Sequence, residues 1–187
     1  VARELMEGQR ANLQTPRPAF TTPVPEYLRD TRGKMIEIGA SYYDALDDND
    51  GSLTPFAEDC VRFENGRQST GNPPPENPAE APAFSIAGSM GCADQLDTQI
   101  MSYIDSIENR RVEIADPETG LVFGISHFFH DMAEDENEVV GIEGTDSVEM
   151  DFDPFDLPAI HIYKVYGGQM HEIEAMGTTL PYQSPKV

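Results

Sequence analysis

The sequence predicts an α+β domain in which helices precede antiparallel pairs of strands. Apolar residues recur every three or four positions over residues 26–46, which is typical of one buried face of a helix. Residues 121–130 are almost all apolar, as in a strand that is covered on both faces. Two more strand-like runs, 159–165 and 170–176, flank a Tyr-Gly-Gly turn at 166–168. Helices and hairpins segregated along the chain in this way indicate the α+β class.

The composition limits the possible partners. The 187 residues suffice for one domain with a substantial core, or for one domain with a long arm. The formal net charge of −22 repels nucleic acid and anionic lipid, so we expect neither nucleic acid nor a membrane as a partner. No apolar run approaches the roughly 18 residues of a membrane span, and no signal peptide is recognisable, so the expected location is cytoplasmic.

The two cysteines restrict metal and redox chemistry. Cys60 and Cys92 do not form a Cys-x-x-Cys pair, which excludes a zinc site built on thiolates. They can pair with each other, but we expect two separate buried thiols in a reducing compartment. No histidine stands near Cys92 in the sequence, so a nucleophilic role for this cysteine has no support.

The first 25 residues predict an extended arm. Gly8 and the prolines at positions 16, 18, 23 and 25 oppose regular structure. Such an arm wraps its own domain or a neighbouring subunit, or it is the tail of a segment that precedes Val1. It favours a homo-oligomer, a dimer or a trimer, and leaves residues 26–187 as the folded domain.

The helix over 26–46 contributes the first polar candidates. Tyr42 lies on its apolar stripe, and Tyr43 lies off the centre of that stripe. Plain core packing is the alternative for Tyr42. The acidic turn at 47–51 does not match the spacing of an EF-hand loop, so it indicates a solvated turn, and 52–57 follows as a short helical or turn segment.

Residues 61–64 alternate as a strand and bring further polar groups close to that helix. Cys60, Arg62 and Glu64 share one face of the strand, and Phe63 lies on the other. An Asn-Gly turn ends the strand. A tyrosine, an arginine, a carboxylate and an amide among apolar neighbours predict a polar spot inside an apolar pocket, although Arg62 and Glu64 can also form a purely structural pair.

The second half of the chain alternates loops with regular elements. Residues 67–90 are rich in proline and glycine and predict a long lid loop. A second amphipathic helix is predicted from about 92 to 107, and a strand over 110–115 pairs with 121–130 through a turn. Residues 131–157 are acidic and contain no Lys, Arg or His, so they indicate a solvated insert; their spacing fits no metal site.

Three motifs resemble those of one superfamily. They are Tyr-Tyr-Asp-Ala-Leu at 42–46, Val-Arg-Phe-Glu-Asn-Gly at 61–66, and Ile-Tyr-Lys-Val-Tyr-Gly-Gly-Gln-Met-His-Glu-Ile-Glu at 162–174. With the order of elements, they make residues 26–176 similar to the NTF2-like superfamily of ketosteroid isomerases and SnoaL-type polyketide cyclases. The resemblance implies an α+β cone, in which a curved mixed or antiparallel sheet wraps around helices and encloses a pocket.

Within this superfamily, the chain most resembles bacterial diarylpropane lyases of lignin catabolism. The shared features are Phe-Glu-Asn-Gly at 63–66, Gly-Cys-Ala-Asp-Gln-Leu at 91–96, and two arginines at 110–111 followed by Asp-Pro-Glu-Thr-Gly-Leu-Val at 116–122. The resemblance implies a cofactor-independent lyase that releases formaldehyde from a 1,2-diaryl-1,3-propanediol and gives a stilbene. The substrate would be a small aromatic, hydrophobic molecule, with no metal. Another SnoaL-like cyclase, isomerase or dehydratase, or a non-catalytic binding domain, is the alternative.

The resemblance also assigns positions in the site. Tyr42 falls where the isomerases keep their oxyanion tyrosine, and Glu64 or Asn65 falls where they keep the general base. His161 falls where they keep a protonated aspartic acid. Two departures distinguish this chain, because an asparagine cannot act as a base and a histidine differs electrically from a neutral carboxylic acid.

A deformylation needs an acid, a base and partners for aryl rings. His161 or His127 suits the acid by pKa, and a nearby Glu64 would raise that pKa. Arg62 would hold Glu64 ionised or bind a phenolate. The expected catalytic residues are His161, Glu64, Arg62, Tyr42 and His127. The expected substrate-binding residues are Asn65, Tyr163, Phe63, Phe123, Phe129, Cys92 and Tyr43, with the three phenylalanines stacking on aryl rings.

Overall fold

A curved mixed sheet of seven strands forms the frame of the molecule, which the computed structural model describes over residues 2–184. The strands follow the order β2-β1-β8-β7-β4-β3, and β9 pairs with β7. β1 and β8 run parallel, and the other pairs are antiparallel. The strands are β1 (Phe56–Glu64), β2 (Arg67–Gln68), β3 (Ser106–Asp116), β4 (Leu121–His130), β7 (Phe155–Tyr166), β8 (Gln169–Gly177) and β9 (Leu180–Pro181).

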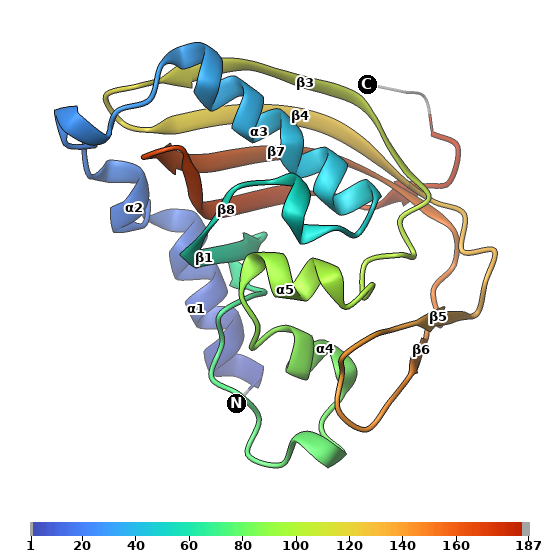
Figure 1. Cartoon of the computed structure of the whole chain (residues 1–187). Coiled ribbons are helices and arrows are strands. Elements are labelled where there is room, and N and C mark those ends of the chain that lie inside the picture. Colours follow the sequence, from blue (N-terminus) through green and yellow to red (C-terminus); the bar gives the residue numbers. More distant parts are fainter. Residues whose placement is uncertain (1, 185–187) are drawn as a thin grey trace.

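Helix α3 (Arg32–Asp47) lies across the concave face of the sheet (Figure 1). The Thr31 side chain caps the helix by accepting a hydrogen bond from a backbone N–H of the first turn. At Gly39, a Cβ would lie 2.9 Å from Cγ1 of Val122, so this glycine lets the helix approach the sheet closely. The predicted helix is confirmed for most of its length, but its first residues form a separate 3₁₀ turn, η1 (Glu26–Leu28).

The predicted α+β class is confirmed, since a curved mixed sheet wraps around α3 and encloses a pocket. The two predicted hairpins are present as β3–β4 and β7–β8. β4 has the predicted bounds, whereas β1 begins well before the strand predicted at 61–64. β1 pairs in parallel with β8 at Phe56 and again from Val61 to Glu64, with a register shift between these two points.

Short helices precede and follow β1 along the chain. They are η2 (Gly51–Leu53), η3 (Pro78–Glu80), α4 (Ala83–Ala87) and α5 (Cys92–Asp97). The helix predicted over 92–107 is wrong beyond residue 97, because Gln99 has a positive φ of 65° and turns follow it. A disulfide joins Cys60 of β1 to Cys92 of α5, which corrects the expectation of two separate thiols. Disulfides persist in oxidising compartments, so this bond counts against the expected cytoplasmic location.

The N-terminal arm is more regular than expected. α1 (Ala2–Gln14) tolerates Gly8, and α2 (Pro18–Thr21) starts at a proline, a favourable first position of a helix. The arm lies beside β1 (Figure 1). Arg17 is nearly buried there, and its guanidinium lies 3.7 Å from the ring centre of Phe63 and 2.7 Å from the Glu174 carboxylate.

The acidic insert is held to the domain by its few apolar and amide side chains. It contains a two-stranded ladder, β5 (Glu136–Glu138) and β6 (Ser147–Glu149). Val139 and Ile142 are buried, and the amide of Asn137 donates to the carbonyl of Gln99. Within residues 2–184, no group of His, Cys, Asp and Glu side chains is arranged to hold a metal ion. No helix of that range is long and apolar enough to cross a membrane.

Candidate functional site

A cavity of about 170 Å³ lies between α3 and the concave face of the sheet. It brings together five residues that the sequence singled out, which are Tyr42, Arg62, Glu64, Asn65 and His161. The remaining lining residues are mainly apolar: Leu46, Met101, Tyr103, Ile104, Phe128, His130, Phe155, Leu157, Ala159, Ala175 and Gly177. Few polar groups in an apolar pocket are typical of a small-molecule site.

Arg62 supplies a buried positive charge at this cavity. The residue is only 3% exposed, and its guanidinium stays protonated at any ordinary pH. Its Nε donates to the Ser69 hydroxyl at 3.1 Å, and Nη2 donates to Oε1 of Gln95 at 2.5 Å. These two bonds hold the guanidinium beside Tyr42, where its charge acts on the tyrosine hydroxyl.

Glu64 and Asn65 form the end of β1 at the mouth of the cavity. One carboxylate oxygen of Glu64 lies 3.0 Å from Nη2 of Arg62, and half of the Glu64 side chain is exposed. Asn65 uses its side-chain oxygen to accept from the backbone N–H of Gly177. The asparagine therefore fixes the turn to β8, while the neighbouring carboxylate remains accessible to solvent and cavity.

Two tyrosines present neutral hydroxyl groups to the cavity. Burial raises the pKa of Tyr42 to about 12, although Arg62 beside it acts in the opposite direction. Burial also raises the pKa of Tyr103 to about 12, with the negative charge of Glu64 adding to the effect. Both remain protonated donors at neutral pH. Tyr103 was missed as a site residue because its spacing fits the predicted helix, and the turn that actually contains it places the ring in the cavity.

His161 is neutral, contrary to its expected role as an acid. Burial, followed by the positive charge of Arg62, lowers its pKa to about 3. Nδ1 lies 3.0 Å from the Tyr43 hydroxyl. The sequence predicted that Glu64 would raise this pKa, but in the folded chain burial and then the charge of Arg62 lower it. An imidazole with this pKa can donate or accept a hydrogen bond without being charged.

Tyr43 and Tyr163 lie behind the cavity and do not line it. Both are fully buried, and burial raises the pKa of each. Their hydroxyls meet at Gly124 of β4, where a Cβ would lie 2.7 Å from the Tyr43 hydroxyl and 3.4 Å from that of Tyr163. Instead of contacting a substrate, Tyr43 positions His161.

His130 faces the cavity and was absent from the predicted site. Its ring stacks on Phe155 with the ring centres 4.0 Å apart. Burial lowers its pKa to about 4. Strand alternation requires His127 and His130 to face opposite sides of β4. Alternation does not say which side is concave, so the sequence could not choose between them.

Five further predicted residues lie outside the cavity. His127, Phe123 and Phe129 project from the opposite face of β4, where His127 stacks on Phe129 and lies 3.6 Å from the Asp156 carboxylate. Phe63 packs under Arg17 on the outer side of β1, since residues 62 and 63 of a strand face opposite ways. Cys92 is held in the disulfide. The predicted aryl-stacking role of the three phenylalanines is therefore wrong for this cavity.

Comparison with solved structures finds similar chains at low identity. A candidate polyketide cyclase from Silicibacter sp. TM1040 is 15% identical, with a TM-score of 0.45 over 78% of this chain and 89% of its own. An NTF2-like protein from Burkholderia thailandensis E264 is 14% identical, with a TM-score of 0.41 over 77% of this chain and 90% of its own. A candidate SnoaL-like polyketide cyclase from Jannaschia sp. CCS1 is 12% identical, with a TM-score of 0.43 over 82% of this chain and 90% of its own.

No curated protein matches the sequence. A family model described as a domain of unknown function, DUF8021, matches residues 28–177. The matched region begins just before α3 and ends with β8, so it contains every element that contributes to the cavity. The chain belongs to the DUF8021 family.

Proposed function

We propose that this protein is an enzyme that transfers protons on a small, hydrophobic carbonyl compound, in the manner of a SnoaL-like isomerase, dehydratase or cyclase. One observation carries the proposal. A buried arginine faces an apolar cavity beside Glu64, which is the only carboxylate among the described lining residues. A base can take a proton from carbon, and a fixed cation beside it can stabilise the negative charge that develops.

In the proposed first step, Glu64 accepts a proton from the carbon next to the carbonyl group. The C–H bond breaks, a carbon–carbon double bond forms, and the carbonyl oxygen becomes an enolate oxygen. Tyr42 and Arg62 lie on the same cavity and supply an O–H and an N–H donor for that oxygen. Returning the proton to a different carbon completes an isomerisation. In a cyclisation, the enolate carbon instead attacks a second carbonyl carbon, and the alkoxide that forms takes the proton from Glu64.

The neutral state of His161 suits this chemistry. When Nδ1 accepts from the Tyr43 hydroxyl, Nε2 carries the proton and can donate to the same oxygen. A low pKa keeps the imidazole uncharged. An uncharged His161 thus resembles the neutral carboxylic acid that the isomerases keep at this position. The two groups therefore do not differ in charge.

The formaldehyde-releasing lyase is less well supported by the geometry. A diarylpropane brings two aryl rings, and the three phenylalanines expected to stack on them lie outside the cavity. Both expected acids also fail that role, because His161 is neutral and His127 lies on the other face of the sheet.

Hydrogen exchange at carbon tests the proposal. The protein would be incubated in D₂O with a panel of small cyclic ketones, enones and 1,3-diketones, and loss of the α-proton signals followed by NMR. We expect exchange faster than in buffer for at least one class, and a decrease of about 10²- to 10⁴-fold in Glu64→Gln. The matched control is Glu58→Gln, because Glu58 is exposed on the same strand and does not line this cavity.

Two outcomes would contradict the proposal. One is the absence of accelerated exchange with every member of the panel. The other is full exchange activity in Glu64→Gln, which would remove the carboxylate from the reaction. A diarylpropanediol would be assayed in parallel for released formaldehyde and stilbene absorbance, so that turnover there would favour the lyase instead.

A further inference from the structure

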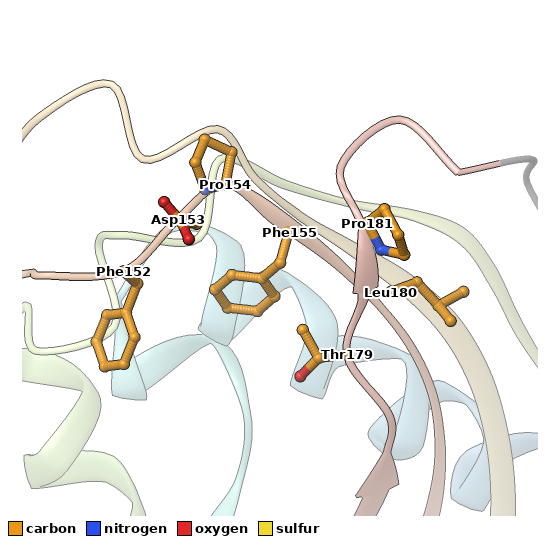
Figure 2. A pocket seen from close by; sticks show the side chains of 7 residues that line it. All are labelled: Phe152, Asp153, Pro154, Phe155, Thr179, Leu180 and Pro181. Atoms are coloured by element: carbon orange, nitrogen blue, oxygen red, sulfur yellow. The ribbon is translucent and has the colours of Figure 1, made fainter.

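An open groove of about 450 Å³ lies at the end of the sheet where the chain enters β7. Figure 2 shows Phe152 and Phe155 on one side of it, and Thr179 and Leu180 on the other. Phe152 is 60% exposed, which is unusual for a phenylalanine. Asp153 is the only ionisable side chain among the described lining residues.

The groove and the internal cavity lie next to each other and share one lining residue, Phe155. The ring of Phe155 stacks on His130 inside the cavity. A second segment also reaches both spaces, because Gly177 lines the cavity and Thr179, two residues later, lines the groove. Phe155 and Pro181 are register partners in the sheet, so the two walls are tied together beside this junction.

The size of the internal cavity favours a ligand that extends beyond it. Alone, a cavity of about 170 Å³ is smaller than the roughly 300–1,000 Å³ of most ligand sites. The groove adds about 450 Å³, which brings the two together into that range. Its lining is mainly apolar, and the carboxylate of Asp153 disfavours an anionic group there.

We propose that this groove binds the uncharged apolar tail of the substrate whose oxygen-bearing head occupies the internal cavity. The proposal rests on the proposed function and extends it to a substrate class. That class is an enolisable ketone that carries an alkyl or aryl tail, and a phenol with the same tail is a non-reacting analogue of its enol. Phe155 lies where head and tail join, and Phe152 and Leu180 contact the tail.

A series of 4-alkylphenols tests the groove. Phenol, 4-ethylphenol, 4-butylphenol and 4-hexylphenol share a head that can accept from Arg62 and Tyr42, and they differ only in tail length. Binding would be measured by calorimetry, since the chain contains no tryptophan. We expect the dissociation constant to fall about two- to threefold for each added methylene that the groove covers.

Variants of the groove distinguish binding of the tail from binding of the head. Phe152→Ser and Leu180→Ser change side chains that are at least partly exposed, and they should flatten the dependence on tail length while phenol still binds as tightly. Phe84→Ser is the control, because Phe84 is 44% exposed and lines neither space. Arg62→Met should weaken every member of the series by a similar factor.

Each other outcome is decisive. If affinity does not depend on tail length, or if the dependence is as steep in both groove variants as in the control, the groove proposal is overturned. In that case the assignment of the head to the internal cavity is retained, provided that Arg62→Met still weakens binding. If the groove variants flatten the series while Arg62→Met changes nothing, the tail is bound without the internal head site. That result overturns the joint proposal and also removes support from the proposed function.

Discussion

The hydroxyl of Tyr43 lies 3.0 Å from Nδ1 of His161, so a residue that does not line the cavity makes a hydrogen bond with the imidazole that does. When the hydroxyl donates to Nδ1, the neutral ring carries its proton on Nε2, which faces the reaction. Tyr43 is fully buried in α3, and His161 is buried in β7. The bond therefore connects the helix to the sheet and to the chemistry of the cavity.

Replacing Tyr43 by phenylalanine should show what this hydrogen bond contributes to activity and what it contributes to stability. We expect Tyr43→Phe to lower proton-exchange activity about tenfold and to cost about 1 kcal/mol of unfolding free energy, because one buried hydrogen bond is lost. Long-range ¹H–¹⁵N spectra of the imidazole should show a changed tautomer ratio at His161. Tyr27→Phe, at a residue that is 85% exposed, is the control and should match the wild type. An unchanged tautomer ratio in Tyr43→Phe would contradict the positioning role.

Gly124 should be intolerant of any side chain. A Cβ there would lie 2.7 Å from the Tyr43 hydroxyl, so Gly124→Ala must displace that group. We expect a loss of about 1–3 kcal/mol in unfolding free energy, together with weaker activity. Gly33→Ala provides the matched control, because nothing lies within 4 Å of a Cβ at Gly33 of α3. That substitution should stabilise the protein by about 0.5–1 kcal/mol. Equal unfolding midpoints for the two variants would show that the close approach at Gly124 does not limit stability.

Acid should destabilise the protein partly through His161. Its folded pKa is about 3, against an unfolded value of about 6.5, so the unfolded state binds more protons between these values. Stability should therefore be full above about pH 6.5 and fall as the pH decreases toward 3. On moving from pH 7.5 to 4.5, the wild type should lose about 2–3 kcal/mol more than His161→Gln. Denaturant titrations at the two pH values measure this, and equal losses in both proteins would refute it.

The disulfide should stabilise the fold and support Arg62. Cys60 and Cys92 are 32 residues apart, and a loop of this size corresponds to about 3–4 kcal/mol. Gln95, which accepts from Arg62, lies one turn of α5 after Cys92. We expect reductant to lower the denaturation midpoint of the wild type and leave the Cys60→Ala/Cys92→Ala variant unchanged. A wild-type midpoint that does not respond to reductant, in protein confirmed to be reduced, would contradict this expectation.

Arg17 should hold the N-terminal arm in place. Its guanidinium bonds to Glu172 at 2.5 Å and to Glu174 at 2.7 Å, and all three side chains are nearly buried. Arg17→Met leaves two carboxylates without their partner and should cost about 3–5 kcal/mol. Lys34→Met, which breaks an exposed pair with Glu37, should change stability by less than about 1 kcal/mol. Limited trypsin digestion gives a second measurement, since the Arg17 variant should be cleaved faster after Arg10. Equal cleavage rates would show that the arm is held by other contacts.

Local pattern alone predicted much of the fold. The nearly continuous apolar run over 121–130 predicted the bounds of β4, and the Tyr-Gly-Gly turn predicted the closing hairpin. The helix over 92–107 failed because apolar spacing cannot distinguish a helix from a turn followed by a strand, when a left-handed residue such as Gln99 interrupts it. In the arm, Gly8 proved too weak a signal to exclude a helix.

Local pattern also predicted part of the candidate site. Tyr42, Arg62 and Glu64 lie close in sequence, so residue type and strand parity sufficed to group them. His130 and Tyr103 could not be found in that way. The side of β4 that becomes concave depends on how the whole sheet curves around α3, and the sequence of one strand does not contain that information.

The sequence by itself determined the class of fold, the order of its elements and the presence of an arginine, a carboxylate and a tyrosine near one another. Those properties follow from side-chain periodicity and turn chemistry, which act over a few residues. Only the tertiary structure decided that His161 is neutral, that Cys60 and Cys92 are bonded, and which histidine of β4 faces the cavity. Burial and proximity to Arg62 arise only when distant segments meet, and they set the protonation state that the chemistry requires.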